Sequence, residues 1–357
     1  MTAEQKRNRL HDPASRVRVT DVAKRAGCAP ATVSRALNNP DMVSPEKRAR
    51  IERAMLDLGY VRNPAARALR SQRSHMVGVL IPTLDYAIYA RMVGAANSKF
   101  SEAGISTLMA TFNYDLDAEV REARLLLERG AEALVLVGNR HRPHLREMLD
   151  QFGVPWVCTY VANPGGAHPT VGFDNAAAAA KLAQHLVHLG HRSICVISGV
   201  TKDNDRTTER LEGIKAELMR HAIKLPDSMI TECPYSISDG RKACALLLSR
   251  ADPKPTAIVC GNDVLALGAL VECQARGLKV PDDISVVGFD NLELSMHSNP
   301  PLTTIDVPAE DMGRAAAEFI LGKLNGEDVS LHNPVDVELI LRDSSAPATP
   351  DRQGEIS

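Results

Sequence analysis

The chain of 357 residues is 44% hydrophobic and 24% charged, which is typical of a globular protein with more than one domain. No apolar run approaches the roughly 18–20 residues of a membrane span, and residues 1–16 lack the hydrophobic stretch of a signal peptide. We therefore expect a cytoplasmic protein without a membrane partner. The seven cysteines are scattered without a C-x-x-C pair, so we expect reduced thiols and no disulfide, bound metal or cofactor.

Charge is distributed unevenly along the chain. Residues 1–75 contain 16 Lys and Arg against 7 Asp and Glu, a net charge of +9, whereas the whole chain carries −2. The remaining residues, 76–357, therefore carry −11. A basic head on an acidic body is typical of a protein whose head binds the phosphate backbone of nucleic acid. Residues 1–16 themselves are polar with mixed charge, and we expect them to form a disordered leader.

Three short amphipathic helices are predicted between residues 17 and 62. The first, over 20–26, has Thr20 as its expected N-cap and ends at Gly27. The second, over 30–37, begins at a proline, and the third, over 45–58, follows Ser44 and has apolar residues at i, i+3, i+4 and i+7. This pattern predicts a helix-turn-helix DNA-binding head over 17–62. A small helical domain without a role on DNA has the same periodicity and stays as the alternative.

Residues 63–75 are predicted to connect the head to the rest of the chain. The segment is rich in alanine and favours a helix, but it is too short to be stable alone in water. The composition therefore predicts a linker that contains a short, helix-prone stretch.

From residue 76 onwards, continuous apolar runs alternate with amphipathic stretches. Strands are predicted at 77–81, 105–110, 133–137, 155–159, 193–198, 257–260 and 285–289, with another opening at 170 and tail strands near 335–341. Helices are predicted at 88–102, 117–129, 144–151, 175–189, 207–222, 238–249, 263–276 and 309–324. Apolar strands between helices are typical of parallel sheets that are covered on both faces.

This alternation predicts an α/β fold in which residues 76–343 form two doubly wound lobes, with the last helix and strands returning to the first lobe. Ligands in such folds lie at the C-terminal ends of strands, so a small molecule between the lobes would contact loops from both. We expect residues 344–357 to form a flexible tail.

Short motifs in the head and the body occur in an order and spacing that can be compared with known families. They are TDVA at 20–23, TVSR at 32–35, VS at 43–44, LGYVRN at 58–63, GHRSI at 190–194, RLEG at 210–213, NDVLALG at 262–268, VPDDISVVGFD at 280–290 and PLTTI at 301–305. Together they closely resemble the lactose-repressor (LacI) family of transcriptional regulators. The resemblance covers nearly all of the chain except about the first 16 and last 12 residues.

The resemblance implies an all-α helix-turn-helix head and a two-lobed, parallel-sheet body like that of periplasmic binding proteins. It implies a sequence-specific regulator, with a repressor favoured, that binds a pseudo-palindromic operator in double-stranded DNA as a homodimer. A small sugar or sugar acid between the lobes would control operator affinity as an allosteric effector. Residues 269–291 are more similar to gluconate-type than to lactose-type regulators, and residues 342–350 lack the leucine heptads of the tetrameric lactose repressor, which favours a dimer.

The DNA-contacting candidates follow from the docking of such heads, whose second helix enters the major groove with its first residues at the base edges. Ala29, Pro30 and Ala31 open this helix, and their apolar surface suits thymine methyl groups, whereas many family members have larger polar residues here. Arg35 is the candidate for hydrogen bonding to guanine. The candidates for phosphate contact are Thr20, Thr32 and Ser34.

In the family, the segment that matches residues 63–69 is a hinge helix that folds on DNA and inserts a leucine into the minor groove. Leu69 stands at the position of that leucine, and the alternative is an ordinary linker leucine. The resemblance places Asn63 among the DNA contacts and Arg67 and Arg70 on the flanking phosphates.

The effector candidates follow predicted strands. Asp290 comes directly after a strand, where a carboxylate can accept hydrogen bonds from ligand hydroxyls, and Arg210 matches the family's arginine that faces the ligand. The other effector-binding candidates, for which capping or core roles are the alternative, are Asp85, Tyr86, Tyr89, Asp174 and Asn262.

Several further side chains are weaker candidates for the same site. Aromatic residues that could pack against a sugar face are Phe173, Trp156 and Tyr235. Arg91 and Arg206 could join Arg210 in binding an anionic ligand, since guanidinium groups bind carboxylates bidentately, or they could be solvated.

Two other classes of protein share parts of this pattern. A sugar-processing α/β enzyme is disfavoured because no G-x-G-x-x-G follows a strand and no G-x-x-x-x-G-K-[ST] occurs. A solute-binding protein of the same fold without a regulatory role is disfavoured by the basic head and by the absence of an export signal.

Overall fold

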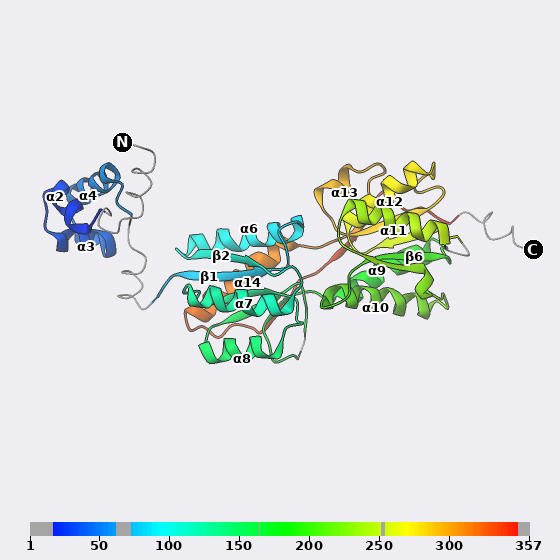
Figure 1. The fold of residues 1–357 in the computed structure, drawn as a ribbon, viewed down its shortest axis with the longest axis horizontal. Coiled ribbons are helices and arrows are strands. Elements are labelled where there is room, and N and C mark those ends of the chain that lie inside the picture. Colours follow the sequence, from blue (N-terminus) through cyan, green and yellow to red (C-terminus); the bar gives the residue numbers. More distant parts are fainter. Residues whose placement is uncertain (1–16, 62–72, 164, 251–253, 349–357) are drawn as a thin grey trace, which may run out of the picture. The chain divides into compact units, whose positions relative to one another are not determined.

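The computed structural model describes residues 17–61, 73–163, 165–250 and 254–348 (Figure 1). The chain divides into two compact units, and the boundary lies between Ser74 and His75. Within the described ranges, no helix has both the length and the apolar character needed to cross a membrane.

The N-terminal unit contains the three predicted helices. They are α2 (Val19–Ala26), α3 (Pro30–Asn38) and α4 (Pro45–Leu58), with a 3-10 turn η2 (Pro40–Met42) between the last two. The prediction of Thr20 as the first N-cap is wrong: Arg18 has the extended cap conformation, and its backbone N–H donates to Asp21 Oδ2 at 2.8 Å. Thr20 therefore lies within α2. Gly27 adopts a left-handed conformation with φ of 63° at the end of that helix, as a tight turn requires.

Small apolar residues hold the three helices together. The buried cluster consists of Val22, Ala23, Ala26, Val33, Ile51 and Ala54. Short side chains let the helix axes approach closely, and polar contacts add to the packing. Arg25 pairs with Asp57 at 2.9 Å, and Arg50 donates to the carbonyls of Ala26 and Gly27, so α4 is attached to the end of α2.

The first lobe of the larger unit is a six-stranded parallel sheet covered by helices on both faces (Figure 1). Its strand order is β11-β5-β4-β3-β1-β2. The strands are β1 (Met76–Ile81), β2 (Ser106–Thr111), β3 (Leu134–Val137), β4 (Trp156–Thr159), β5 (Thr170–Gly172) and β11 (His332–Pro334). The helices are α6 (Ala87–Glu102), α7 (Leu116–Glu128), α8 (Pro143–Phe152) and α14 (Ala309–Leu324).

The second lobe has the same architecture, with the strand order β12-β10-β9-β8-β6-β7. All its strand pairs are parallel except β10 with β12. The strands are β6 (Ile194–Gly199), β7 (Ile230–Cys233), β8 (Ala257–Cys260), β9 (Ser285–Asp290), β10 (Thr303–Asp306) and β12 (Glu338–Ile340). The helices are α9 (Asn175–His188), α10 (Asp205–Arg220), α11 (Ile237–Arg250), α12 (Asp263–Ala275) and α13 (Glu293–His297), with a 3-10 turn η3 (Asp227–Met229).

The predicted α/β class and doubly wound lobes are confirmed. The strands could be predicted because several of them are buried along their whole length. Every residue of β3, β4 and β8 is buried, and each of these strands is a continuous apolar run in the sequence. The prediction missed β7, α13 and β10, which are short and mix polar with apolar residues. The expected return of all C-terminal elements to the first lobe is half wrong: α14 and β11 return to it, but β12 pairs with β10 in the second lobe.

The expected flexible tail does not begin at residue 344. Ser344 is fully buried, and its hydroxyl accepts a hydrogen bond from Thr303 N at 2.8 Å and donates to Val286 O at 2.6 Å. Further on, Ala348 N donates to Leu189 O at 2.8 Å. Residues 344–348 therefore bind along the second lobe, and only residues 349–357 of the predicted tail lie outside the described range.

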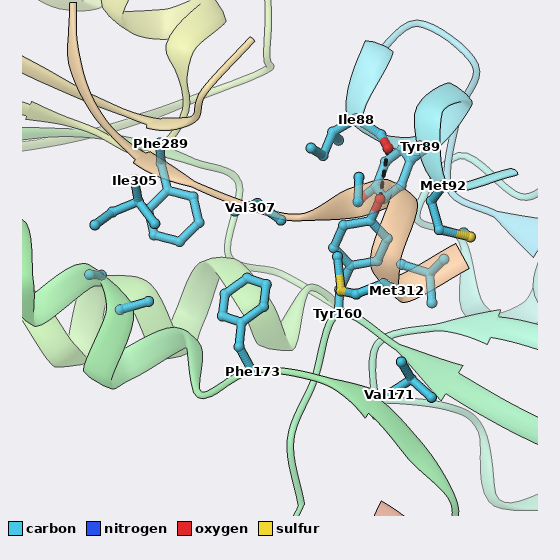
Figure 2. Packing of buried hydrophobic residues seen from close by; sticks show 14 of the residues in the cluster. Ile88, Tyr89, Met92, Tyr160, Val171, Phe173, Phe289, Ile305, Val307 and Met312 are labelled. Carbon is cyan, nitrogen blue, oxygen red and sulfur yellow. Dashed lines mark hydrogen bonds between the residues drawn. The ribbon is translucent and has the colours of Figure 1, made fainter. Parts of the chain in front are cut away.

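One buried hydrophobic cluster continues from the first lobe into the second. In it Phe173, just after β5, stacks with Phe289 of β9, with ring centroids 6.1 Å apart. Figure 2 shows Tyr160 nearby, with its hydroxyl directed at the Ile88 carbonyl, to which it donates at 2.7 Å. The lobes are thus joined by core packing directly beneath the ends of their strands.

Candidate functional site

The exposed surface of α3 carries the predicted DNA-contacting residues. Only Val33 of this helix is buried. The residues at its start, Ala29, Pro30 and Ala31, are exposed, as is Arg35 one turn later, while Thr32 and Ser34 are half-buried. Thr20 is exposed in α2. The arrangement leaves the N-terminal end of α3 accessible, as contact with base edges requires.

The four candidates that follow the head in sequence, Asn63, Arg67, Leu69 and Arg70, lie outside the described residues. Their contacts with DNA therefore stay predictions from the resemblance.

The larger unit contains a pocket at the C-terminal ends of strands from both lobes. Its empty space is about 400 Å³, part of which is open to solvent. The first lobe contributes residues after β1, β2 and β4, and the second contributes residues after β6, β7 and β8 and the last residue of β9. The lining residues are Tyr86, Ile88, Tyr89, Tyr114, Tyr160, Asn204, Arg206, Thr207, Arg210, Tyr235, Asn262 and Asp290.

Five of the seven predicted effector residues line this pocket: Tyr86, Tyr89, Arg210, Asn262 and Asp290. The other two predicted residues do not line it. Asp174 is exposed and caps α9, accepting a hydrogen bond from Ala177 N at 2.9 Å. Asp85 is exposed and forms a turn with Thr83, whose hydroxyl lies 3.1 Å from Asp85 Oδ2.

Arg210 and Asp290 form the charged centre of the pocket. Their closest atoms, Arg210 Nη1 and Asp290 Oδ1, are 3.9 Å apart, and both side chains are largely buried. Arg210 donates from Nε to Asn175 Oδ1 at 2.9 Å and from Nη1 to Gly261 O at 3.1 Å, and its guanidinium lies 3.8 Å above the centre of the Phe289 ring. The guanidinium is thus fixed in place before a ligand arrives.

Burial raises the pKa of Asp290 to about 7, although Arg210 opposes this shift. The carboxylate is 5% exposed and has Arg210 as its ion-pair partner within the described residues. A carboxylate desolvated to this degree is stabilised by donors, so ligand hydroxyls that donate to it would favour its ionised form.

Arg206 was a weak candidate for an anion site, and the structure gives it an internal partner. Its Nη1 lies 2.7 Å from Asp205 Oδ1, and both side chains are largely buried. Arg91, the other weak candidate, does not line the pocket and makes a bidentate pair with Glu310 at 2.7 and 2.8 Å. Neither guanidinium is therefore available as an unpaired cation for an acidic ligand.

Tyrosine rings and hydroxyls form much of the remaining wall. Tyr86 of the first lobe meets Tyr235 of the second edge-on, with ring centroids 5.2 Å apart. Tyr89 contacts Tyr160 edge-on at 5.4 Å, and its hydroxyl lies 3.3 Å from that of Tyr114. Burial raises the pKa of Tyr86 to about 12, so this wall presents neutral hydroxyls and ring faces. Such surfaces suit the C–H faces and hydroxyls of a ring compound.

The sequence did not identify several lining residues. Tyr114, Tyr160, Asn204 and Thr207 lie in loops or at a helix start, and the place of each loop beside the pocket depends on strand order in the sheet. Tyr235 and Arg206 were weak candidates and do line the pocket. Two other weak candidates are core residues: Trp156 is buried in the first lobe, and Phe173 packs on Phe289.

In the described ranges, no group of three or more His, Cys, Asp or Glu side chains is arranged to hold a metal ion. The seven cysteines are free, and six of them are buried. Apart from Ile88, the residues that line the pocket are polar or aromatic.

Comparison with protein families gives two matches. The family of bacterial regulatory proteins called lacI matches residues 18–63, and the periplasmic binding protein-like domain matches residues 183–345. Among characterised relatives, the HTH-type transcriptional repressor CytR of Escherichia coli K12 is 33% identical over 91% of this chain and 95% of its own length. The HTH-type transcriptional regulator GntR of Pseudomonas aeruginosa is 34% identical over 92% of this chain and 95% of its own length.

Solved structures show the same architecture. A lac repressor dimer bound to operator and the anti-inducer ONPF has a TM-score of 0.81 at 27% identity, covering 93% of this chain and 99% of that chain. A complex of the transcriptional regulator CelR with cellobiose has a TM-score of 0.69 at 29% identity, covering 92% of this chain and 100% of that chain. Because this chain is 33% identical to CytR over 91% of its own residues and its head matches the family model, it belongs to the lacI family of bacterial regulatory proteins.

Proposed function

We propose that this chain is a sequence-specific transcriptional regulator that binds an operator as a homodimer, and that a small sugar or sugar acid in the pocket controls operator affinity. Repression is the favoured direction of control. The observation that carries the proposal is the presence in one chain of an exposed α3 on a basic head and of a polar pocket at the strand ends of two lobes.

Two relatives of known structure support both halves of the proposal. The lac repressor was crystallised as a dimer on its operator together with an anti-inducer, and CelR was crystallised with cellobiose. We propose corresponding partners for this chain: a pseudo-palindromic duplex for two heads and a small hydroxylated ring compound for each pocket.

For the DNA interface, we propose that Ala29, Pro30 and Ala31 contact thymine methyl groups and that Arg35 reads guanine. Exposure of the first turn of α3 supports these roles. The half-buried hydroxyls of Thr32 and Ser34, and Thr20 at the start of α2, would contact phosphates.

For the connection between the units, we propose that residues 63–75 act as a hinge on DNA. Leu69 would open a base step in the minor groove, which costs a few kcal/mol and is offset by wider contact between protein and DNA. Asn63, Arg67 and Arg70 would contact the backbone beside it.

For the effector, we propose that Asp290 accepts hydrogen bonds from ligand hydroxyls and that Arg210 donates to a ligand oxygen. Tyr86, Tyr89 and Asn262 would complete the contacts. The pairing of Arg206 with Asp205 and of Arg91 with Glu310 favours an uncharged sugar over a sugar acid, because Arg210, the third arginine considered for an anionic ligand, also has an acidic partner, Asp290.

Selection from random DNA with the full-length protein, followed by fluorescence anisotropy on the selected duplex, tests the DNA half. The Leu69→Ala variant should weaken operator binding strongly without changing effector binding. Failure of the protein to select any DNA sequence, even at low salt, would instead support a solute-binding role.

A thermal-shift panel of neutral sugars, sugar acids and purines tests the effector half, since a ligand that binds only the folded state raises the melting temperature. A shift that disappears in Arg210→Ala assigns the ligand to this pocket. Turnover of a bound sugar would revive the enzyme alternative; we propose a regulator that acts without catalysis, in the cytoplasm where its DNA is.

A further inference from the structure

A buried group of ionisable side chains lies in the first lobe, outside the pocket. Glu119 of α7 and His141, in the loop after β3, both have fully buried side chains. His141 Nδ1 lies 3.0 Å from each Glu119 oxygen, and its Nε2 lies 3.2 Å from Gly138 O and 3.3 Å from Cys158 Sγ. The group therefore connects a helix, a strand and a loop that are far apart in the sequence.

The surroundings of His141 favour its charged form. Burial alone would lower the pKa of His141, but Cys158 and Glu119 raise it to about 10. In that form both ring nitrogens carry hydrogens, and the contacts match Nδ1 donating to the Glu119 carboxylate and Nε2 donating to the Gly138 carbonyl. A buried ion pair persists only where its geometry and additional hydrogen bonds offset the desolvation of both charges. A pair of this kind fixes the backbone that it contacts.

The backbone that it contacts is residues 138–141, here called the platform loop. The N–H groups of Asn139 and Arg140 in this loop donate to Asp205 Oδ2 at 2.5 and 3.2 Å. Asp205 belongs to α10 of the second lobe, so these hydrogen bonds cross between the lobes. Two N–H groups that converge on one carboxylate require the loop to keep its conformation.

The platform loop is also shaped to admit Arg206. Gly138 has a φ of +85°, and any Cβ there would clash with the Arg206 guanidinium. Arg206 in turn pairs with Asp205 at 2.7 Å and lines the pocket. A continuous set of contacts therefore leads from Glu119 through His141 and the platform loop to the pocket wall.

We infer that Glu119 and His141 are positioning residues of the effector pocket, which hold the platform loop in the conformation on which Asp205 and Arg206 of the second lobe dock. The pocket has its observed shape only while that docking persists. The importance of this docking for effector binding rests on the proposed function, whereas the docking itself does not depend on which molecule binds.

Amide hydrogen exchange in the full-length protein, resolved to single residues, tests the inference without DNA or effector. Glu119→Gln and His141→Gln should each speed exchange at Asn139 and Arg140 at least about tenfold, while β1 keeps its protection. The matched control is Glu217→Gln, which removes another buried glutamate paired with a histidine, in this case His221 at 3.2 Å, the residue that follows α10. This control should leave the platform loop unchanged.

A double variant separates positioning from general stability. Asp205→Ala removes the acceptor from the other lobe, and combining it with Glu119→Gln should speed exchange no further than the faster single variant, because both changes release the same contact. Glu119→Asp, which keeps the charge but shortens its reach, should give an intermediate effect in a folded protein.

Three outcomes would overturn the inference: unchanged exchange of the platform loop in Glu119→Gln, multiplicative effects in the double variant, or equal loss of protection in β1. The last outcome would mean that the pair maintains the fold of the lobe. Failure of the wild-type protein to bind DNA or sugar would contradict the proposed function alone, since the exchange measurement involves neither.

Discussion

Two arginines at the two candidate interfaces have opposite environments. Arg35 is exposed on α3, on a head with a net positive charge. Arg210 is largely buried, stacks on Phe289 and donates to Asn175 and Gly261. An exposed guanidinium can adapt to a nucleic acid and is screened by salt, whereas a fixed, desolvated guanidinium recognises one ligand geometry and is screened little.

The two sites also differ in how far apart in the sequence the residues that support them lie. The head presents α3 through a small core and two surface contacts, so its function depends on residues close together in sequence. The pocket combines seven strand ends from two lobes, and its central ion pair joins Arg210 of α10 to Asp290 of β9. We expect substitutions in the head to act locally and substitutions in the pocket to affect several properties at once.

The largest expected effect is that of Arg210→Ala on the effector response. The variant loses a donor to the ligand and leaves Asp290 buried without its cation, so we expect effector affinity to fall at least about 100-fold. Operator affinity without effector should stay within about twofold. Anisotropy titrations with and without the sugar identified by thermal shift measure both quantities.

The control is Arg276→Ala, which removes an exposed arginine at the end of α12 and should change neither quantity. If Arg210→Ala lost operator binding as well as the effector response, the pocket arginine would be needed for folding. That result would contradict the expectation that the two sites can be altered separately.

A second prediction concerns pH. The pKa of Asp290 is about 7 in the folded chain against 3.8 for the ordinary side chain. Between about pH 4 and 7 the folded state therefore holds a proton that the unfolded state has released, so this group's stabilising contribution falls as pH rises through that range and is constant above it. Between about pH 4 and 7 this group therefore lowers the free energy of unfolding by at most about 4 kcal/mol.

Chemical denaturation of the wild type and Asp290→Asn at several pH values between 4 and 8 measures this contribution. Glu209 and Asp263, whose pKa values burial raises to about 7 and about 6, contribute in the same direction, so the difference between the two proteins isolates Asp290. A sugar that donates to Asp290 should bind more tightly as pH rises from 6 to 8. Parallel stability curves for the two proteins would contradict the assignment.

A third prediction concerns the exposed arginine. Arg35→Ala should weaken operator binding about 10- to 100-fold, the range expected for one bidentate contact with a base, and should relax selectivity at one base pair. Effector binding should not change. Arg53→Ala is the matched control, an exposed arginine on α4 of the same head.

Competition among duplexes that differ at single positions of the selected operator would resolve the effect by base pair. A uniform loss across all duplexes, equal to that of Arg53→Ala, would assign Arg35 to the phosphate backbone and not to base recognition.

How much the sequence predicted depends on how local each signal is. The apolar runs of β3 and β8 and the proline that begins α3 are local signals, and the predicted elements match them. Asp174 and Asp290 illustrate the limit: both stand where an apolar run ends, but Asp174 caps the next helix, whereas Asp290, the last residue of β9 with φ of 111°, lines the pocket. The same local pattern fits both roles, and only the three-dimensional arrangement separates them.

Residues that act through distant partners could not be predicted in the same way. Glu119 and His141 are separated by 22 residues, and Asp205 meets the platform loop across 65 or more, without a shared motif. Ser344 lies in a segment rich in serine, alanine and proline, which is typical of a tail, but its hydroxyl bonds to strands of the second lobe. Composition indicates how a segment behaves alone and not what it binds after folding.

The smallest expected effect is that of Ser344→Ala on stability, which tests whether residues 344–348 are part of the folded second lobe. Ser344→Ala removes a buried hydroxyl that accepts from Thr303 N and donates to Val286 O, leaving both backbone groups without this partner. We expect a loss of about 1–3 kcal/mol in the free energy of unfolding, measured by denaturant titration. Ser249→Ala, at an exposed serine of α11, is the control and should change stability by less than about 0.5 kcal/mol. Operator and effector affinities should stay the same in both variants, because the hydrogen bonds of residues 344–348 go to residues of the second lobe that do not line the pocket, such as Thr303, Val286 and Leu189. A change in effector affinity in Ser344→Ala alone would show that β9 transmits strain from this segment to Asp290.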